Sequence, residues 1–112
     1  MAQRLTNYLL TYRKRAGLSQ DEMAFLLGTT SGTRVSRYER FGREPGLQTA
    51  LAYEIIFAAA QQDLFAGLYE QVERGVLQRA GALLRRLEGA GGMSRPGRQK
   101  LEALRGVISK NN

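Results

Sequence analysis

Apolar residues recur at three- and four-residue spacing along most of the chain, which is the period of amphipathic helices. The pattern predicts helices over residues 3–16, between residues 19 and 28, over residues 31–40 and from residue 46 to about residue 58. Residues 61–88 carry a longer pattern, in which Gly67, Gly75 and Gly81 each weaken a helix by up to about 1 kcal/mol relative to alanine. Two shorter helices, a kinked helix and a straight helix all fit that stretch. Because no alternating run is flanked by hairpin turns, the sequence predicts an all-α fold.

Short polar and glycine motifs mark the ends of these helices. Ser19 and Glu22 have the spacing of a capping box, in which each side chain accepts a hydrogen bond from the backbone N–H of the other residue. The hydroxyls of residues 29–31 can cap the third helix. The expected stops are Gly17, Gly28, Gly42 and Pro45.

Two expectations concern the buried side of the fourth helix and the end of the helical part. We expect the apolar side of the fourth helix to consist of Leu47, Leu51, Ile55 and Ala58, widened by Tyr53, Ile56 and Phe57.

Residues 89–92 (GAGG) and 94–97 (SRPG) predict a linker. Beyond the linker we expect a basic tail that is solvated and partly disordered. One or two amphipathic helical turns are expected within this tail, with Leu101, Leu104, Val107 and Ile108 as their apolar residues.

Composition excludes several classes of site. The 112 residues allow one compact domain and an appended element, and no run approaches the roughly 20 apolar residues of a membrane span. The chain has no cysteine and no histidine, so disulfides and thiolate metal sites are excluded and the usual general base is missing. Residues 92–98 have the glycine spacing of a phosphate-binding loop but lack its Lys and Ser/Thr. With no signal peptide recognisable, we expect a cytoplasmic protein without catalytic activity, cofactor or metal.

The net charge of +7 is concentrated at the two ends of the chain. Residues 1–45 carry eight basic and four acidic side chains, a balance of +4. Residues 46–88 carry four and five, a balance of −1, and residues 89–112 carry five and one, a balance of +4. This distribution favours a polyanionic partner, nucleic acid before an acidic membrane surface.

The third predicted helix, within residues 30–42 (TSGTRVSRYERFG), is basic on one side and apolar on the other. At about 100° per residue, Val35 and Tyr38 share the buried side, Arg37 and Arg40 lie opposite, and Arg34 projects from the flank. An arginine can bind phosphate oxygens or the edge of guanine in bidentate fashion. A helix about 10 Å wide also fits a major groove about 12 Å wide. A capped helix, a glycine turn and a basic helix in this order predict a helix-turn-helix motif.

The same residues resemble a known family. Residues 18–24 (LSQDEMA), 27–28 (LG), 35–40 (VSRYER) and Pro45 are similar, at nearly the same spacing, to the helix-turn-helix domain of the Cro/CI and XRE-type regulators. The resemblance covers about residues 5–60. It implies a lambda-repressor-like helix-turn-helix bundle of four to five helices, here with a C-terminal helical extension, that binds double-stranded DNA.

The resemblance also implies roles for single residues. Ser31, Gly32, Thr33 and Arg37 match the positions nearest the base edges, and Arg34 and Ser36 flank them. Gln20 matches a glutamine that holds the DNA backbone and supports the recognition helix, whereas Arg40 and Arg43 match phosphate-contacting positions. Arg13 and Glu39 match a partly buried, structural salt bridge. The DNA-binding candidates are therefore Gln20, Thr30, Ser31, Thr33, Arg34, Ser36, Arg37, Arg40 and Arg43.

Two departures from the family pattern affect this comparison. The stretch between Gly28 and Val35 is one residue longer than usual, which can lengthen the turn or shift the start of the recognition helix. Phe41 interrupts the expected Glu-Arg-Gly sequence. We expect Phe41 to fill the core at the end of the third helix rather than to lie exposed beside DNA.

The second half of the chain predicts an association surface. The expected domains are a DNA-binding domain at residues 1–60, a helical extension at 61–88 and a linker with a basic tail at 89–112. The candidate dimer surface comprises Leu68, Val72, Val76 and Leu83, although the same helix can pack back on the first and fourth helices. The sequence thus predicts a regulator, most simply a repressor that binds a palindromic operator as a homodimer. Two alternatives remain: an antitoxin-like autoregulator that holds a partner toxin, and a protein-interaction module that binds DNA only nonspecifically.

Overall fold

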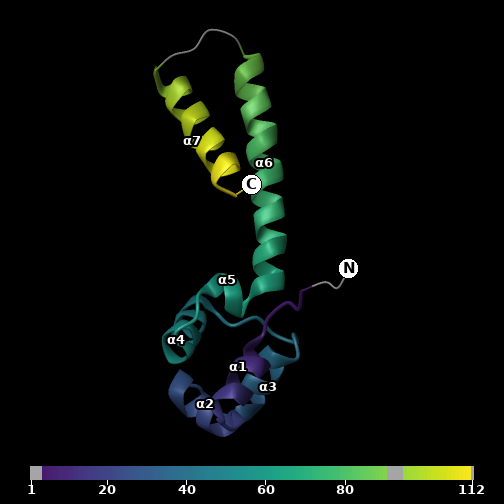
Figure 1. The fold of residues 1–112 in the computed structure, drawn as a ribbon, viewed down its shortest axis with the longest axis vertical. Coiled ribbons are helices and arrows are strands. Elements are labelled where there is room, and N and C mark those ends of the chain that lie inside the picture. Colours follow the sequence, from purple (N-terminus) through teal and green to yellow (C-terminus); the bar gives the residue numbers. More distant parts are fainter. Residues whose placement is uncertain (1–3, 91–94, 112) are drawn as a thin grey trace. The chain divides into compact units, whose positions relative to one another are not determined.

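The computed structural model describes residues 4–90 and 95–111, and this part of the chain contains helices and no strand. The prediction of an all-α fold is therefore confirmed. The chain divides into two compact units, residues 1–69 and residues 70–112. The helices, drawn in Figure 1, are α1 (Leu9–Ala16), α2 (Gln20–Leu27), α3 (Gly32–Glu39), α4 (Leu47–Phe57), α5 (Gln61–Leu64), α6 (Ala66–Gly89) and α7 (Arg95–Asn111). Among these described helices, none is long and apolar enough to cross a membrane.

The first unit packs α1 to α5 and the first turn of α6 around one apolar core. Helix α2 contacts both α3 and α4, and α1 contacts α3. Tyr53 of α4 is fully buried, with its ring 6.4 Å from the ring of Tyr38 in an edge-on arrangement and 6.0 Å from that of Phe57. The core cluster consists of Leu9, Met23, Ala24, Val35, Tyr38, Tyr53, Leu64 and Phe65. These contacts hold α2 and α3 in a fixed mutual orientation.

The predicted helix ends in this unit follow local chemistry. Ser19 Oγ accepts the Glu22 N–H at 3.0 Å, and the Glu22 carboxylate accepts the Ser19 N–H at 2.8 Å, which completes the capping box. Gly17 and Gly28 end α1 and α2 in the left-handed conformation, each with φ 72°. Glycine adopts this conformation without the steric penalty that a Cβ imposes.

The first helix is shorter than predicted. It begins at Leu9 rather than near residue 3, and residue 3 itself lies outside the described part. The preceding backbone is bonded elsewhere: the carbonyls of Leu5 and Thr6 accept the N–H groups of Gly67 and Leu68, at 2.8 and 3.2 Å. Asn7 Oδ1 accepts the Leu9 N–H at 3.1 Å. These long-range bonds replace the helical ones, which the local apolar pattern could not reveal.

The apolar stripe predicted to be the buried side of α4 is its exposed side. Leu47, Leu51 and Ile55 are 76%, 47% and 80% exposed, and Ala58 lies past the last helical residue with φ 50°. The rest of the prediction is confirmed, because Tyr53 is fully buried and Ile56 and Phe57, together with Ala50, are partly buried against the core. Because α4 is apolar almost all round, its periodicity does not distinguish the two sides, and the aromatic packing decides between them.

The stretch predicted as one, two or kinked helices is two helices. The break lies at Phe65, between α5 and α6, whereas Gly75 and Gly81 lie inside α6. At Gly67 the packing requires a glycine, since a Cβ there would overlap the Leu5 carbonyl group and would lie 2.7 Å from the carbonyl carbon. The residues before α1 thus pass directly over the first turn of α6.

The second unit is a pair of antiparallel helices, the remainder of α6 and α7 (Figure 1). Ala80 and Leu101 are buried, and Arg105 Nη2 lies 2.9 Å from Glu88 Oε2. The expectation of a partly disordered tail with one or two helical turns is wrong, because α7 runs from Arg95 to Asn111. The predicted linker overlaps helix at both ends, since α6 continues through Gly89 and α7 begins at Arg95. Of the predicted linker, residues 91–94 lie outside the described part. Pro96 lies in the first turn of α7, where proline is tolerated because no helical acceptor awaits its missing N–H.

Candidate nucleic-acid interface

The amino ends of α2 and α3 meet at a close contact that places the third helix. The Gly32 N–H donates to Asp21 Oδ1 at 3.2 Å, so an aspartate of α2 caps α3, and the side chain of the N-cap residue Ser31 makes no capping bond. A Cβ on Gly32 would lie 2.5 Å from that oxygen and 3.1 Å from the Cβ of Gln20. Gly32 is buried in this contact between the two helices and does not lie at an exposed position near base edges.

Helix α3 presents a basic outer side to solvent. Val35 and Tyr38 are buried in the core, as the helical period predicts. Thr33, Arg34, Arg37 and Arg40 are exposed, whereas Ser36 is half-buried. The one carboxylate of the helix, on Glu39, is buried, so its exposed charges are all positive. Such a surface suits contact with a phosphate backbone.

Glu39 ties α3 to α1 through a buried ion pair. Arg13 Nε lies 2.6 Å from Glu39 Oε2 and Arg13 Nη2 lies 3.1 Å from Oε1, a bidentate arrangement. The side chains of Arg13 and Glu39 are 11% and 2% exposed. The hydrogen bonds to Glu39 raise the pKa of the Arg13 guanidinium above its usual value, against the opposing effect of burial. Arg13 Nη1 also donates to the Leu18 carbonyl at 2.9 Å, which extends the network to the turn before α2.

Gln20 joins the same network from the start of α2. Its Nε2 donates to Glu39 Oε1 at 3.1 Å, so the side chain that the resemblance assigns to backbone contact also supports α3. A groove of about 640 Å³ opens here between the two helices. Its lining combines the hydroxyl, amide and guanidinium groups of Ser19, Gln20, Thr33, Ser36 and Arg40 with the carboxylate of Asp21. The groove therefore offers hydrogen-bond donors to an anionic ligand.

The remaining candidates flank α3 at both ends. Thr30 and Ser31 are exposed before its first residue, and Arg43 is exposed in the loop after it. The helix starts one residue after Ser31, so the longer stretch between Gly28 and Val35 is taken up in the turn. The structure brings Gln20, Thr33, Ser36 and Arg40 together in the groove, whereas the lining of the groove does not include Thr30, Ser31, Arg34, Arg37 and Arg43.

Phe41 does not fill the core, contrary to expectation. It is 48% exposed and has φ 64°, the left-handed conformation at the position where the family pattern has glycine. The Phe41 N–H donates to the Tyr38 carbonyl at 3.2 Å, and the Gly42 N–H donates to the Arg37 carbonyl at 2.9 Å, which closes the end of α3. Phe41 therefore adopts the backbone conformation that a glycine has at this helix end, although its side chain makes that conformation unfavourable.

Two supporting residues were missed by the sequence reasoning. Asn7 is buried and its Nδ2 donates to the Tyr38 carbonyl at 2.9 Å, which joins the segment before α1 to the end of α3. Asp21 of α2 caps α3, a contact over 11 residues that no local pattern indicates. An asparagine whose side-chain oxygen accepts the N–H two residues on forms a local turn, but the contact of Asn7 with Tyr38 spans 31 residues and leaves no local pattern.

The candidate dimer residues do not all share one environment. Leu68 is half-buried against the core of the first unit. Val72, Val76 and Leu83 are 56%, 42% and 39% exposed and belong to the second unit. Three of the four side chains are thus exposed within the single chain.

The comparison with known proteins agrees with this geometry. Residues 9–58 match a family model described as Helix-turn-helix. The match begins at the first residue of α1 and ends at the residue after α4. No curated protein and no solved structure matches the chain significantly.

Proposed function

We propose that the chain, whose residues 9–58 match the Helix-turn-helix family model, is a DNA-binding repressor of the Cro/CI (XRE-type) family that binds a palindromic operator as a homodimer. The observation that carries the proposal is the exposed, all-basic outer side of α3 beside the groove at the start of α2. A buried Arg34 and Arg37 would favour a protein-interaction module, and both are exposed. A cytoplasmic location is part of the same proposal.

The proposed complex places α3 in the major groove. Thr33 and Arg37 read base edges, since a bidentate arginine contact with guanine is the commonest specific pairing. Gln20, Arg34, Arg40 and Arg43 contact phosphates, and the hydroxyls of Thr30, Ser31 and Ser36 add donors at the groove edge. The ion pair of Arg13 with Glu39 holds the helix at a fixed angle for this contact.

Dimerisation is proposed to use the second unit. Two helices that bury Ala80 and Leu101 while exposing Val72, Val76 and Leu83 have little core of their own. A second copy would cover these side chains and produce a four-helix arrangement, a packing that many bundles use. Two recognition helices spaced by one DNA turn, about 34 Å, would then match a two-fold symmetric site.

In-vitro selection from a random DNA pool at about 150 mM salt, where nonspecific binding is weak, tests this function. The expected result is enrichment of a two-fold symmetric motif that binds two chains, measured by sedimentation of the complex. Enrichment of an asymmetric motif that binds one chain would contradict the dimer, and no enrichment would contradict specific recognition. Val72→Ser with Val76→Ser should weaken assembly of two chains on the site, whereas Leu10→Ser, an exposed apolar position in α1, should not.

A further inference from the structure

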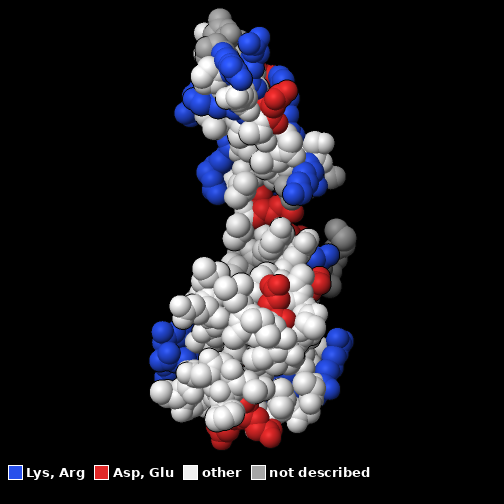
Figure 2. Space-filling view, turned by 90° about the vertical axis from the view of Figure 1, so that its left-hand side faces the viewer, with Lys and Arg blue, Asp and Glu red and all other residues white. Residues whose placement is uncertain are grey.

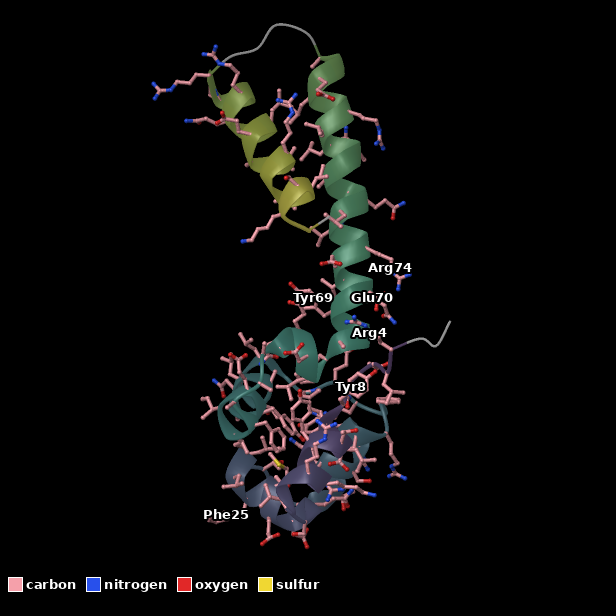
Figure 3. The ribbon with its side chains drawn as sticks, viewed as in Figure 1. Arg4, Tyr8, Phe25, Tyr69, Glu70 and Arg74 are labelled. Atoms are coloured by element: carbon pink, nitrogen blue, oxygen red, sulfur yellow. The ribbon has the colours of Figure 1, made fainter. Side chains whose placement is uncertain are left out.

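The outer sides of α2 and α4 carry large apolar side chains that the fold does not use. Phe25, Leu47 and Ile55 are 84%, 76% and 80% exposed, and Leu26 and Leu51 are 48% and 47% exposed. Phe25 points away from the body of the unit in Figure 3. We call these five residues, on two helices that contact each other, the α2–α4 face.

The residues of the α2–α4 face are not needed to form the core, because each helix packs against the core with its other side. The opposite side of α2 buries Met23 and Ala24, and the opposite side of α4 buries Tyr53. The apolar residues of α4 on the face are four residues apart, so they form one stripe along the outer side of the helix. Exposed apolar residues gathered in this way mark interaction surfaces, whereas single ones are ordinary.

Charge distinguishes this face from the rest of a strongly basic chain. No Lys or Arg occurs in residues 17–33 or 44–73, which include all of α2, α4 and α5. The charges on these three helices are the carboxylates of Asp21 and Glu22 on α2, Glu54 on α4 and Asp63 on α5. Figure 2 shows this side of the first unit as largely uncharged, with acidic side chains on it and basic ones at its margins. The local charge of these helices is therefore negative, which favours a basic ligand over a phosphate group.

We propose that the α2–α4 face binds a basic amphipathic helix of another protein. An apolar stripe on such a helix would cover Leu47, Leu51 and Ile55, and flanking Lys or Arg side chains would lie near the carboxylates of Asp21, Glu22 and Glu54. Helix-in-groove recognition commonly uses apolar anchors at three- and four-residue spacing. A second copy of the chain would instead bring the same carboxylates together across a two-fold axis, which disfavours it as the occupant.

The arginines of α3 form no part of the α2–α4 face, so occupancy by a protein helix leaves the basic surface free. The inference goes beyond the proposed function, since it concerns a second partner that binds while DNA is held. The binding of such a helix does not depend on the proposed function, because a chain that binds no operator could still bind the helix.

The test uses the full chain and two synthetic helical peptides with the same Leu stripe, one with Lys and one with Glu at the flanking positions. Each peptide carries one Trp, whose fluorescence reports binding because the chain itself contains no Trp. The Lys peptide should bind and the Glu peptide should not. Phe25→Ser with Ile55→Ser should weaken binding about tenfold or more, whereas Leu10→Ser, elsewhere on the same unit, should change it by less than about twofold.

Binding of the Lys peptide should survive saturation with DNA, and the Phe25→Ser with Ile55→Ser variant should keep the DNA affinity of the wild type. Circular dichroism of the variants establishes that they are folded. Equal binding of both peptides, or binding of neither, would overturn the proposal. A loss of self-association in the Phe25→Ser with Ile55→Ser variant, seen by sedimentation, would overturn it in favour of a second copy on the face.

Discussion

Replacing Glu39 by alanine removes the acceptor on which three side-chain hydrogen bonds converge. Two come from Arg13, at 2.6 and 3.1 Å, and one comes from Gln20, at 3.1 Å. The guanidinium of Arg13 then keeps one partner, the Leu18 carbonyl, while it stays almost wholly buried. Breaking a buried ion pair from one side costs about 3–5 kcal/mol, so Glu39→Ala should lower the free energy of unfolding by about that amount.

The double variant Arg13→Met with Glu39→Leu separates this reasoning from simple loss of packing. It removes both charges and replaces them with apolar side chains of similar size, so its free energy of unfolding should lie close to that of the wild type. Urea denaturation followed by circular dichroism at 222 nm measures all variants. The matched control is Arg105→Ala, which breaks the exposed pair with Glu88 and should cost about 1 kcal/mol or less.

The reasoning would be refuted if Glu39→Ala were as mild as Arg105→Ala, or if the double variant lost as much as Glu39→Ala. The first result would mean that the ion pair does not hold α3 on α1. The second would mean that the side-chain shapes, rather than an uncompensated charge, account for the loss.

Three further predictions concern backbone and core chemistry, and each is measured by the same denaturation. Gly67→Ala should destabilise by about 1–3 kcal/mol, since its Cβ would overlap the Leu5 carbonyl; a stability equal to that of Gly89→Ala, where the site is open, would contradict this. Tyr53→Phe should be neutral or stabilise by about 1 kcal/mol, because the buried hydroxyl has no hydrogen-bond partner; a loss above that size would imply one. Phe41→Gly should stabilise by up to about 1 kcal/mol, because glycine relieves the left-handed φ of 64°, and a clear loss would show that the ring packs productively.

Features that depend on neighbouring residues could be predicted from the sequence. The capping box of Ser19 and Glu22 and the left-handed stops at Gly17 and Gly28 are local, and each lies where the pattern indicated. The buried side of α3 was also predictable, since Val35 and Tyr38 are its only large apolar residues. The arginines on the other side then had to face solvent, so the candidate DNA surface followed from local helical geometry.

Features that depend on distant contacts could not be predicted in this way. The start of α1 is decided by hydrogen bonds between Leu5 and Gly67, and the buried side of α4 by the aromatic ring of Tyr53. Phe41 was misjudged because its apolar character suggested the core, whereas the helix stop dictates its backbone. In α7, local composition indicated a solvated tail, while the structure has a helix with Leu101 buried.

The central claim is that α3 reads a DNA sequence through Arg37 while Arg43 contributes backbone affinity. Fluorescence anisotropy titrations of the wild type, Arg37→Ala and Arg43→Ala, on the selected site and on a scrambled site, test it most directly. Arg37→Ala should lose about 1–3 kcal/mol on the selected site and little on the scrambled one, whereas Arg43→Ala should weaken binding to both alike. Equal losses for the two variants on both sites would contradict the claim.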